Sequence, residues 1–261
     1  MKRRRLAEAD VVVIRKRLVS LHFQKTVGHL GGNLSSIDAI SLIVNEYCDD
    51  PRQFVLSKGH SALALYTALW FRGVISDADL DSALDDGTQL PAHPPFDRLA
   101  KLAIPFGTGS LGHGLSLSVG LALAHHQRRS DETIYCLLSD GEIQEGQTIE
   151  ALGFAANQGL ANLVVLIDGN GLQGFGTTEE VQKGRDHEAL LRSFAVDFEK
   201  TNGHNLNDMR RSLDVQGRAR PLVLWLDTVK GFGVLEIEGK ISSHYWPLTQ
   251  AQYDTAKGGL V

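Results

Sequence analysis

The sequence predicts an α/β fold, with a single open, mostly parallel sheet and helices on both of its faces. Two short apolar runs rich in strand-forming residues, at 134–138 and 163–167, do not alternate with polar residues. This pattern is typical of strands that are buried on both faces of a parallel sheet. The segment between them, 148–160, fits one crossover helix, so the three segments form a βαβ unit. No linker or internal repeat divides the 261 residues, and we expect one domain over 1–261.

The other elements follow from hydrophobic periodicity and from the positions of turn residues. Before the βαβ unit we expect an amphipathic helix at 6–27, a loop at 28–35 and a helix at 38–47 that is capped by Ser35 or Ser36. A strand at 54–56 and helices at 62–70 and 77–84 should follow. We then expect a long loop at 85–106 and a helix at 115–126. After it we expect a flexible loop at 174–178, a helix at 187–194, a strand end at 195–198, a helix at 208–213 and an apolar strand at 221–229.

Composition and charge exclude several classes of protein. Hydrophobic residues make up 43% and charged residues 22%, as in a soluble globular protein. A net charge of −5 argues against general nucleic-acid binding. No apolar run approaches the roughly 18 residues of a membrane span. The two cysteines lack zinc-site spacing and suit a reducing compartment, so we expect a cytoplasmic protein that does not bind a membrane.

The polar residues that follow the two buried strands point to a metal and an anion. Asp140 ends the first strand and Asn170 follows the second, so both emerge at the carboxyl edge of the sheet, where open α/β sheets bind ligands. A carboxylate, an amide carbonyl and a backbone carbonyl at Leu172 would supply half of an octahedral Mg²⁺ site, with water and phosphate completing it. Gly141 and Gly146 allow close approach at a helix N-terminus, which favours an anion. These residues predict a Mg²⁺–diphosphate site.

The string SDGEIQEG, with Asn170 thirty positions beyond Asp140, resembles the thiamine-diphosphate signature, and its Gln-Glu-Gly ending is similar to transketolase. The resemblance implies thiamine diphosphate and Mg²⁺ as cofactors, with Asp140, Asn170 and the Leu172 carbonyl as metal ligands. It also implies that Gly141, Glu142, Glu145 and Asn170 bind the cofactor, and that Glu145 couples distant cofactor sites across a dimer.

Four histidines lie in strings that resemble transketolase loops. His29, in GHLGGN, resembles the histidine of a Gly-His-Pro-Gly-Gly loop that contacts the donor substrate, although Leu30 replaces the proline. His60, in SKGHS, resembles the histidine that binds the cofactor diphosphate. His93 matches a Gly-His-Pro element in part, and His244 stands where the family has a histidine that reaches the diphosphate and the substrate. The resemblance therefore implies His29, His93 and His244 as catalytic residues and His60 and His244 as cofactor ligands.

The glycine-rich block GTGSLGHG contains the pattern Gly-x-Gly-x-x-Gly. A dinucleotide fingerprint needs a strand immediately before it and an acidic residue about 20 positions later, at the end of the next strand. Residues 104–106 make a poor strand, and the acidic pair at 131–132 precedes the next strand. The block instead resembles the transketolase loop Thr-Gly-x-Leu-Gly-Gln-Gly, which implies that Gly109 and Leu111 hold the aminopyrimidine of the cofactor. His113 replaces the usual glutamine of that loop.

The resemblance extends from His29 to His244 and covers only the amino-terminal, diphosphate-binding domain of transketolase. No segment resembles the second domain, which carries the glutamate that protonates the aminopyrimidine. The resemblance therefore implies the first subunit of a split transketolase, active only with a C-terminal subunit that supplies this glutamate, in an α2β2 assembly. Its reaction would move a two-carbon ketol unit from a ketose or its phosphate to an aldose or its phosphate.

Two other functions stay open at this point. The first is a subunit of another thiamine-diphosphate enzyme, similar to deoxyxylulose-phosphate synthase or to a 2-oxo-acid dehydrogenase; the loop histidines and the Lys-Gly-x-Gly string at 230–233 favour transketolase over the dehydrogenase. The second is a noncatalytic regulatory paralogue, because Ser139 replaces the first glycine of the signature and Gly169 replaces one of its paired asparagines. Both predicted metal-binding side chains are nevertheless present.

Overall fold

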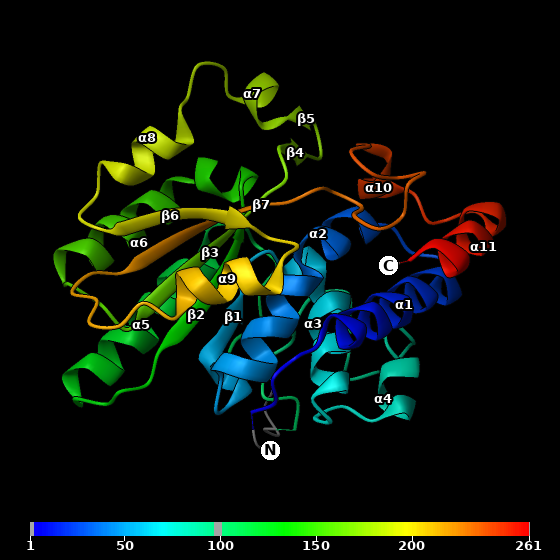
Figure 1. Cartoon of the computed structure of the whole chain (residues 1–261), viewed down its shortest axis with the longest axis horizontal. Helices are drawn as coiled ribbons and strands as arrows, with labels where there is room; N and C mark the ends of the chain where they lie inside the picture. Colours follow the sequence, from blue (N-terminus) through cyan, green and yellow to red (C-terminus); the bar gives the residue numbers. More distant parts are fainter. Residues whose placement is uncertain (1–2, 97–100, 261) are drawn as a thin grey trace.

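Five parallel strands form one open sheet at the centre of the molecule (Figure 1). The computed structural model describes residues 3–96 and 101–260. Across the sheet the strands lie in the order β1 (Phe54–Leu56), β2 (Ile134–Ser139), β3 (Leu163–Gly169), β7 (Leu222–Asp227) and β6 (Asp197–Asn202). The chain places β6 at the far edge and then inserts β7 between β3 and β6. Because all five strands are parallel, their carboxyl ends meet along one rim, and the predicted fold class is confirmed.

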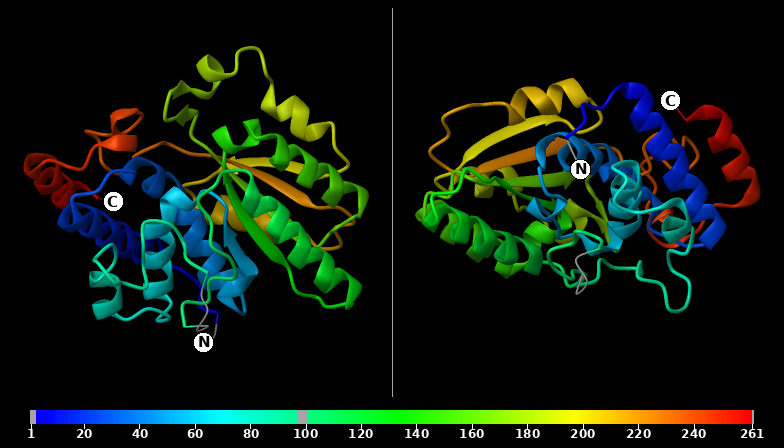
Figure 2. Two further views of the ribbon diagram at one scale, coloured as in Figure 1. Left: turned by 180° about the vertical axis from the view of Figure 1, so that it is seen from behind. Right: turned by 90° about the horizontal axis from the view of Figure 1, so that it is seen from below.

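Helices cover both faces of the sheet. The hydrophobic core on the first face includes residues of α1 (Glu8–Lys25), α2 (Leu30–Leu42), α3 (Ala62–Phe71) and α9 (Leu206–Leu213), with α1 packed on α2 and α3, and the core on the second face includes residues of α5 (His113–Gln127), α6 (Gly146–Asn157) and α8 (His187–Arg192). Seen from behind, α5 and α6 lie in front of the sheet (Figure 2).

Strand β2 shows why the apolar runs do not alternate with polar residues. Tyr135 and Leu137 pack into the core on the first face, and Ile134, Cys136 and Leu138 pack into the core on the second. Since each successive side chain meets a hydrophobic layer, no position of the strand is left for a solvated residue.

Shorter elements complete the chain. A π-helical turn covers Ile43–Tyr47, and 3₁₀ turns cover Pro51–Gln53, Gly59–Ser61 and Gly141–Gln144; the others are α4 (Asp77–Asp81), the antiparallel pair β4 (Leu172–Gln173) and β5 (Gly176–Thr177), α7 (Thr178–Val181), α10 (Ser242–Tyr245) and α11 (Gln250–Gly259). Helix α11 lies along α1, where the rings of Phe23 and Tyr253 stack with centroids 4.0 Å apart. None of the helices in the described part of the chain is long and apolar enough to cross a membrane.

The predicted loop at 28–35 is wrong, because α2 already begins at Leu30. His29 adopts a left-handed conformation (φ 64°) and separates this helix from α1. The hydroxyl of Ser36 donates to the carbonyl oxygen of Gly32 inside the helix, and that of Ser35 donates to Asp168, so neither serine caps a later helix. All residues of α2 are buried, and tertiary packing overrides the weak helix propensity of its glycines and serines.

Two other boundaries differ from expectation, whereas the long loop at 85–106 agrees with it. The strand expected to end within 195–198 instead begins there, as β6. Part of the loop expected at 174–178 forms β5 of the small hairpin. The long loop at 85–106 contains neither helix nor strand in its described residues, and residues 97–100 lie outside the described part of the chain.

A buried polar network joins α1 and α2 to the segment that follows β7. The guanidinium of Arg15 donates to Asp38 through Nε (2.8 Å), and Nδ1 of His204 lies 2.8 Å from the other oxygen of this carboxylate. Nε2 of His204 accepts from the backbone N–H of Val229 (2.9 Å), and its ring stacks on Phe232 with centroids 3.6 Å apart. These contacts fix the chain on both sides of position 230.

Candidate active site

A cavity of about 300 Å³ lies at the carboxyl rim of the sheet. Segments that follow β1, β2, β3 and β7 all reach it, together with the start of α2, the 109–111 loop and helix α10. Nine of the residues predicted from the sequence line it: His29, His60, Gly109, Leu111, Asp140, Gly141, Asn170, Leu172 and His244. His93, Glu142 and Glu145 are not among its lining residues.

Asp140, Asn170 and Leu172 line the same cavity. The backbone N–H of Gly171 donates to Oδ2 of Asp140 (2.6 Å), and the N–H of Leu172 donates to Oδ1 of Asn170 (3.1 Å). The carbonyl of Leu172 accepts from Nζ of Lys230 at 3.2 Å. One carboxylate and two carbonyl oxygens are donors suited to a hard cation such as Mg²⁺. No group of three or more His, Cys, Asp or Glu side chains within residues 3–96 and 101–260 is arranged to hold a metal ion.

Asp168 is a buried carboxylate behind the cavity that the sequence pattern did not single out. It receives hydrogen bonds from Ser35 Oγ (2.6 Å), Asn170 Nδ2 (3.1 Å), Thr228 Oγ1 and the ammonium of Lys58. Burial alone would raise the pKa of Asp168, but the charge and hydrogen bond of Lys58 and the two hydroxyl donors outweigh it, so the pKa is lowered. The signal was present as an acidic residue at the end of the apolar run Leu-Val-Val-Leu-Ile.

Because Asp168 binds the amide nitrogen of Asn170, it fixes which way this amide points. The nitrogen donates to the carboxylate, and the oxygen Oδ1 accepts from the N–H of Leu172. Asp168 on β3 thereby anchors the start of α2 and the segments that follow β1 and β7 through hydrogen bonds to one carboxylate.

Two lysines place positive charge in the cavity. Lys58 is 1% exposed and forms an ion pair with Asp168. Lys230 is also buried, and burial followed by the charge of Lys58 lowers its pKa to about 8. Asp140 has its pKa raised to about 6 by burial and by the neighbouring charge of Asp168. A divalent cation beside Asp140 would favour its ionised form.

Three imidazoles stand together on one side of the cavity. The ring centroids of His29 and His244 are 4.8 Å apart, those of His29 and His60 are 5.7 Å apart, and those of His60 and His244 are 6.0 Å apart. Burial lowers the pKa of each, and the next contribution is the charge of Lys230 for His29 and His244 and that of Lys58 for His60. The pKa of His244 falls to about 4. All three rings are therefore neutral at pH 7 and can both donate and accept a hydrogen bond.

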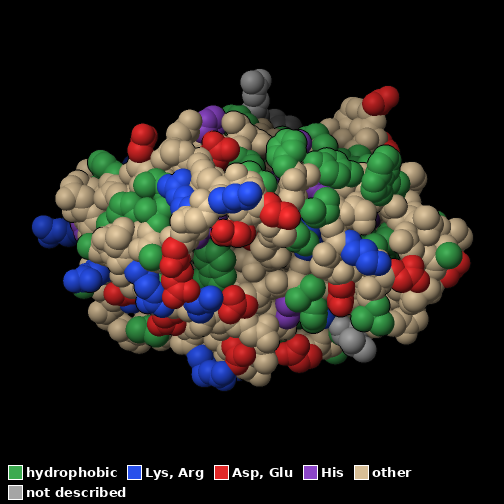
Figure 3. Space-filling model, turned by 90° about the horizontal axis from the view of Figure 1, so that it is seen from above, with side chains coloured by type: hydrophobic (Ala, Val, Ile, Leu, Met, Phe, Trp, Pro, Cys, Tyr) green, Lys and Arg blue, Asp and Glu red, His purple; other side chains and the backbone are tan. Residues whose placement is uncertain are grey.

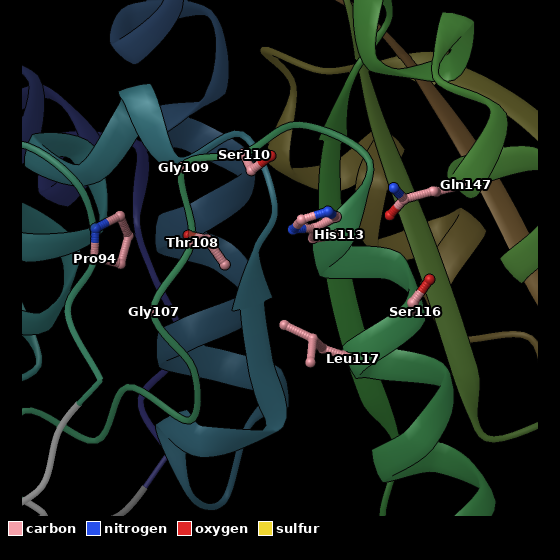
Figure 4. A pocket seen from close by; sticks show the side chains of 9 residues that line it. All are labelled: Pro94, Gly107, Thr108, Gly109, Ser110, His113, Ser116, Leu117 and Gln147. Carbon is pink, nitrogen blue, oxygen red and sulfur yellow. The ribbon is translucent and has the colours of Figure 1, made fainter.

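The glycine-rich loop at 107–112 separates this cavity from a second one of about 370 Å³. A Cβ at Gly109 would lie 3.0 Å from Cδ2 of His93, so His93 packs against the back of the loop. His113, Ser116 and Gln147 line the second cavity between this loop and the first turns of α5 (Figure 4). His113 is therefore not a lining residue of the first cavity.

The two predicted glutamates support the loop from behind. Glu142 is fully buried, and its carboxylate accepts from Ser57 Oγ and from the N–H groups of Gly112 (2.8 Å) and Ser139 (3.3 Å). Burial raises the pKa of Glu142 despite these donors. Glu145 is exposed at the start of α6, next to Gly112. Both assignments stay predictions.

Comparison with known proteins identifies related sequences. The family model described as "Transketolase, thiamine diphosphate binding domain" matches residues 39–260. An apulose-4-phosphate transketolase subunit from Phocaeicola vulgatus is 37% identical over 255 residues, which cover 93% of this chain and 89% of the relative. The "6-deoxy-6-sulfo-D-fructose transketolase subunit SqwG" of Clostridium sp. is 34% identical over 259 residues, which cover 95% of this chain and 94% of the relative.

Solved structures share the fold. Transketolase from Leishmania mexicana superposes with a TM-score of 0.82 at 22% identity, over 97% of this chain and 41% of that one. A transketolase variant from Pichia stipitis superposes with a TM-score of 0.80 at 24% identity, over 96% of this chain and 40% of that one. The chain thus spans about two fifths of the length of these solved structures.

Proposed function

This chain belongs to the transketolase family, whose thiamine-diphosphate-binding domain it matches, and on that premise we propose that it is one subunit of a two-subunit transketolase. The reaction is the transfer of a two-carbon ketol unit from a ketose or its phosphate to an aldose or its phosphate. The observation that carries this proposal is the cavity at the carboxyl rim, where oxygen donors, two buried lysines and three neutral imidazoles lie together. The other thiamine-diphosphate enzymes and the noncatalytic paralogue gain no comparable support.

The cavity fits a magnesium ion with a diphosphate. Asp140, Asn170 and the carbonyl of Leu172 would bind Mg²⁺, and phosphate oxygens with water would complete its octahedral shell. Lys230 and His60 line the same cavity and would bind the diphosphate as hydrogen-bond donors. Gly109 and Leu111 would contact the aminopyrimidine side of the cofactor. When bound, thiamine diphosphate supplies the electron sink of the reaction.

The protein's own contribution is to orient the substrate and move protons. His29 and His244 are neutral and partly exposed to the cavity, so each can donate to or accept from a sugar hydroxyl at Nδ1 or Nε2. Nδ1 of His244 lies 3.3 Å from Nζ of Lys230, which makes Lys230 the nearest source of a proton for that ring. His93 stands behind the glycine-rich loop, and we keep it as a proposed catalytic residue that acts once substrate is bound.

A partner protein completes the proposed enzyme. The names of the two relatives above include the word "subunit", and the solved transketolases are more than twice as long as this chain. We propose that the partner is a C-terminal transketolase subunit that carries the pyrimidine-site glutamate. The complete enzyme would be a cytoplasmic α2β2 assembly.

Calorimetric titration with thiamine diphosphate tests the cofactor assignment. In the presence of Mg²⁺ and the partner subunit, the wild-type chain should bind the cofactor, and Asp140→Ala should abolish the Mg²⁺-dependent part of the affinity because the only predicted carboxylate ligand is gone. Asp131→Ala removes an exposed carboxylate outside the cavity and is the matched control. Retained affinity in Asp140→Ala would refute the metal site. Failure of the wild-type complex to bind the cofactor would refute the proposed function.

A further inference from the structure

A cavity of about 400 Å³ adjoins the cofactor cavity on the far side of two of its imidazoles. The two cavities share His29, His60 and Tyr245 as lining residues. The adjoining cavity has apolar walls from Val27, Leu63, Leu84 and Ala92. None of its described lining residues carries a carboxylate, an ammonium or a guanidinium group. It is therefore a neutral space that borders His29, a proposed catalytic residue, and His60, a proposed ligand of the diphosphate.

His22 lines this cavity as a buried polar group without a partner. Its side chain comes from α1 and is 2% exposed, and neither ring nitrogen has a hydrogen-bond partner in the described structure. The carbonyls of Val27 and Gly28 and the Asn33 side chain lie nearby, but without ordinary hydrogen-bond geometry. Leaving a buried polar group unsatisfied is unfavourable, so such groups call for a ligand or a water.

The same cavity gathers strained backbone. Among the described residues, five other than glycine have positive φ, and three of them line this cavity: Thr26 (51°), His29 (64°) and Leu84 (67°). Side chains with a Cβ rarely adopt this region unless the surrounding structure holds them there. Backbone strain of this kind concentrates at ligand-binding sites. The strained residues and the unpartnered ring of His22 therefore both indicate that this cavity binds a ligand.

We propose that this cavity binds the hydroxylated carbon chain of the sugar substrate, with His22 hydrogen-bonding one of its hydroxyls. The inference rests on the proposed function and names the part of the substrate that this chain recognises. A sugar backbone offers C–H groups to the apolar walls and hydroxyls to the imidazoles. A neutral imidazole matches a hydroxyl, because each has one donor and one acceptor.

The positions of the buried lysines indicate which part of the substrate the His22 cavity binds. Both buried lysines lie in the neighbouring cavity, where Lys58 is already paired with Asp168 and Lys230 bonds the Leu172 carbonyl. No lysine or arginine is among the described residues that line the His22 cavity, so a phosphate there would have no counter-ion. The subsite therefore takes a neutral polyol segment, and a charged terminus of the substrate would lie outside it.

Steady-state kinetics on the complex with the partner subunit test the subsite. We expect His22→Leu to raise the KM for L-erythrulose, a neutral four-carbon ketose, by about 5- to 10-fold, the effect of one lost hydrogen bond, with kcat within about 2-fold. His22→Gln keeps a donor and an acceptor and should recover most of the affinity. His126→Leu, on the exposed side of α5, makes the same change of residue type elsewhere and should match wild type.

An NMR titration supplies a readout that does not depend on activity. In the histidine-labelled holo-complex, L-erythrulose should shift the ring resonances of His22, and inorganic phosphate should not. Calorimetry on the same variants should show unchanged thiamine-diphosphate affinity, which separates this subsite from the cofactor site. Unchanged KM in His22→Leu, or a wild-type His22 resonance that ignores the ketose while the cofactor binds, would overturn the subsite and leave the proposed function standing. If His22→Leu does not fold, His22→Gln and the wild-type titration still decide.

Discussion

At the residue scale, the Asp168–Lys58 pair couples stability to the site. Both side chains are buried, so removing one charge leaves the other desolvated and unpaired. We expect Asp168→Asn to lower the free energy of unfolding by roughly 3–5 kcal/mol, measured by denaturant titration. The double variant Asp168→Asn with Lys58→Met should recover part of the lost free energy of unfolding, because it no longer buries an ammonium group without a counter-ion.

A surface ion pair provides the control for the Asp168→Asn prediction. Asp81 pairs with Arg17, and its side chain is 57% exposed. Asp81→Asn should cost less than about 1 kcal/mol, since water already solvates the carboxylate. Equal losses for Asp168→Asn and Asp81→Asn would show that burial of the Asp168 pair has no energetic consequence.

His22 should make stability depend on pH. Its pKa is lowered from 6.5 to about 4, chiefly by burial, so the folded state binds fewer protons than the unfolded state between these values. The stabilising contribution is complete above pH 6.5 and is lost as the pH falls toward 4. Between pH 7 and pH 4.5 the loss amounts to about 2 kcal/mol.

Unfolding free energies at the two pH values, compared between wild type and His22→Leu, check this prediction. The other titratable groups are common to both proteins, so the difference between the two pH dependences isolates His22. A variant whose stability falls as steeply as that of wild type between pH 7 and pH 4.5 would contradict the expectation.

At the element scale, helix α5 carries two glycines with opposite roles. A Cβ at Gly114 would lie 2.6 Å from Cα of Ser57 and closer still to its side chain, whereas a Cβ at Gly120 would meet nothing within 4 Å. Gly114→Ala must push α5 away from the end of β1 and should cost about 1–3 kcal/mol. Gly120→Ala should stabilise the helix by about 0.5–1 kcal/mol. Thermal unfolding of both variants checks the contrast, and a stable Gly114→Ala would refute this account of the packing.

The buried strands and the amphipathic helices could be predicted from the sequence, because periodicity records burial directly. Strands β2, β3 and β7 and helices α1, α3 and α6 lie within a few residues of their predicted positions. Helix α2 could not be predicted in this way, since its glycines and serines favour a loop locally. It is helical because three-dimensional packing surrounds it completely.

The candidate site likewise contains residues that could be predicted from the sequence and residues that could not. Asp140 and Asn170 were predictable, because each follows an apolar strand and strand ends share one rim. Asp168 was not, because its role depends on donors from α2, the segment after β1 and the segment after β7. The His22 cavity was also hidden, since a histidine within an amphipathic helix carries no local sign that its ring is buried.

At the scale of the whole molecule, exposed aromatic side chains gather beside the cavity at the carboxyl rim, which Phe175 and Tyr245 line. Phe175 is 91% exposed, Trp246 is 71% exposed, and the hydroxyl of Tyr245 donates to the carbonyl of Gly174 (2.7 Å), which joins the hairpin to α10. Hydrophobic side chains also gather in the upper right of the face seen in Figure 3. Exposed aromatic groups of this kind are typical of protein interfaces.

We expect Phe175→Ser and Trp246→Ser each to weaken association with the partner subunit by about 10-fold or more. Each substitution removes an aromatic anchor and should leave the fold unchanged, since both side chains already face solvent. Val215→Ser changes an exposed apolar residue that precedes β7, at the opposite edge of the sheet, and is the control. Sedimentation or surface binding measurements would decide, and equal affinity for all three variants would exclude this surface from the interface.

The anchoring of the rim by Asp168 has a consequence for biosynthesis. Its donors Ser35 and Lys58 lie 133 and 110 positions earlier in the chain, and Thr228 lies 60 positions later. A growing polypeptide therefore synthesises the two early donors long before the carboxylate exists, and the last donor only when β7 is complete. The hydrogen bonds that anchor the rim at Asp168 are therefore complete only after Thr228 has been synthesised, so the earlier segments must form without this last anchor.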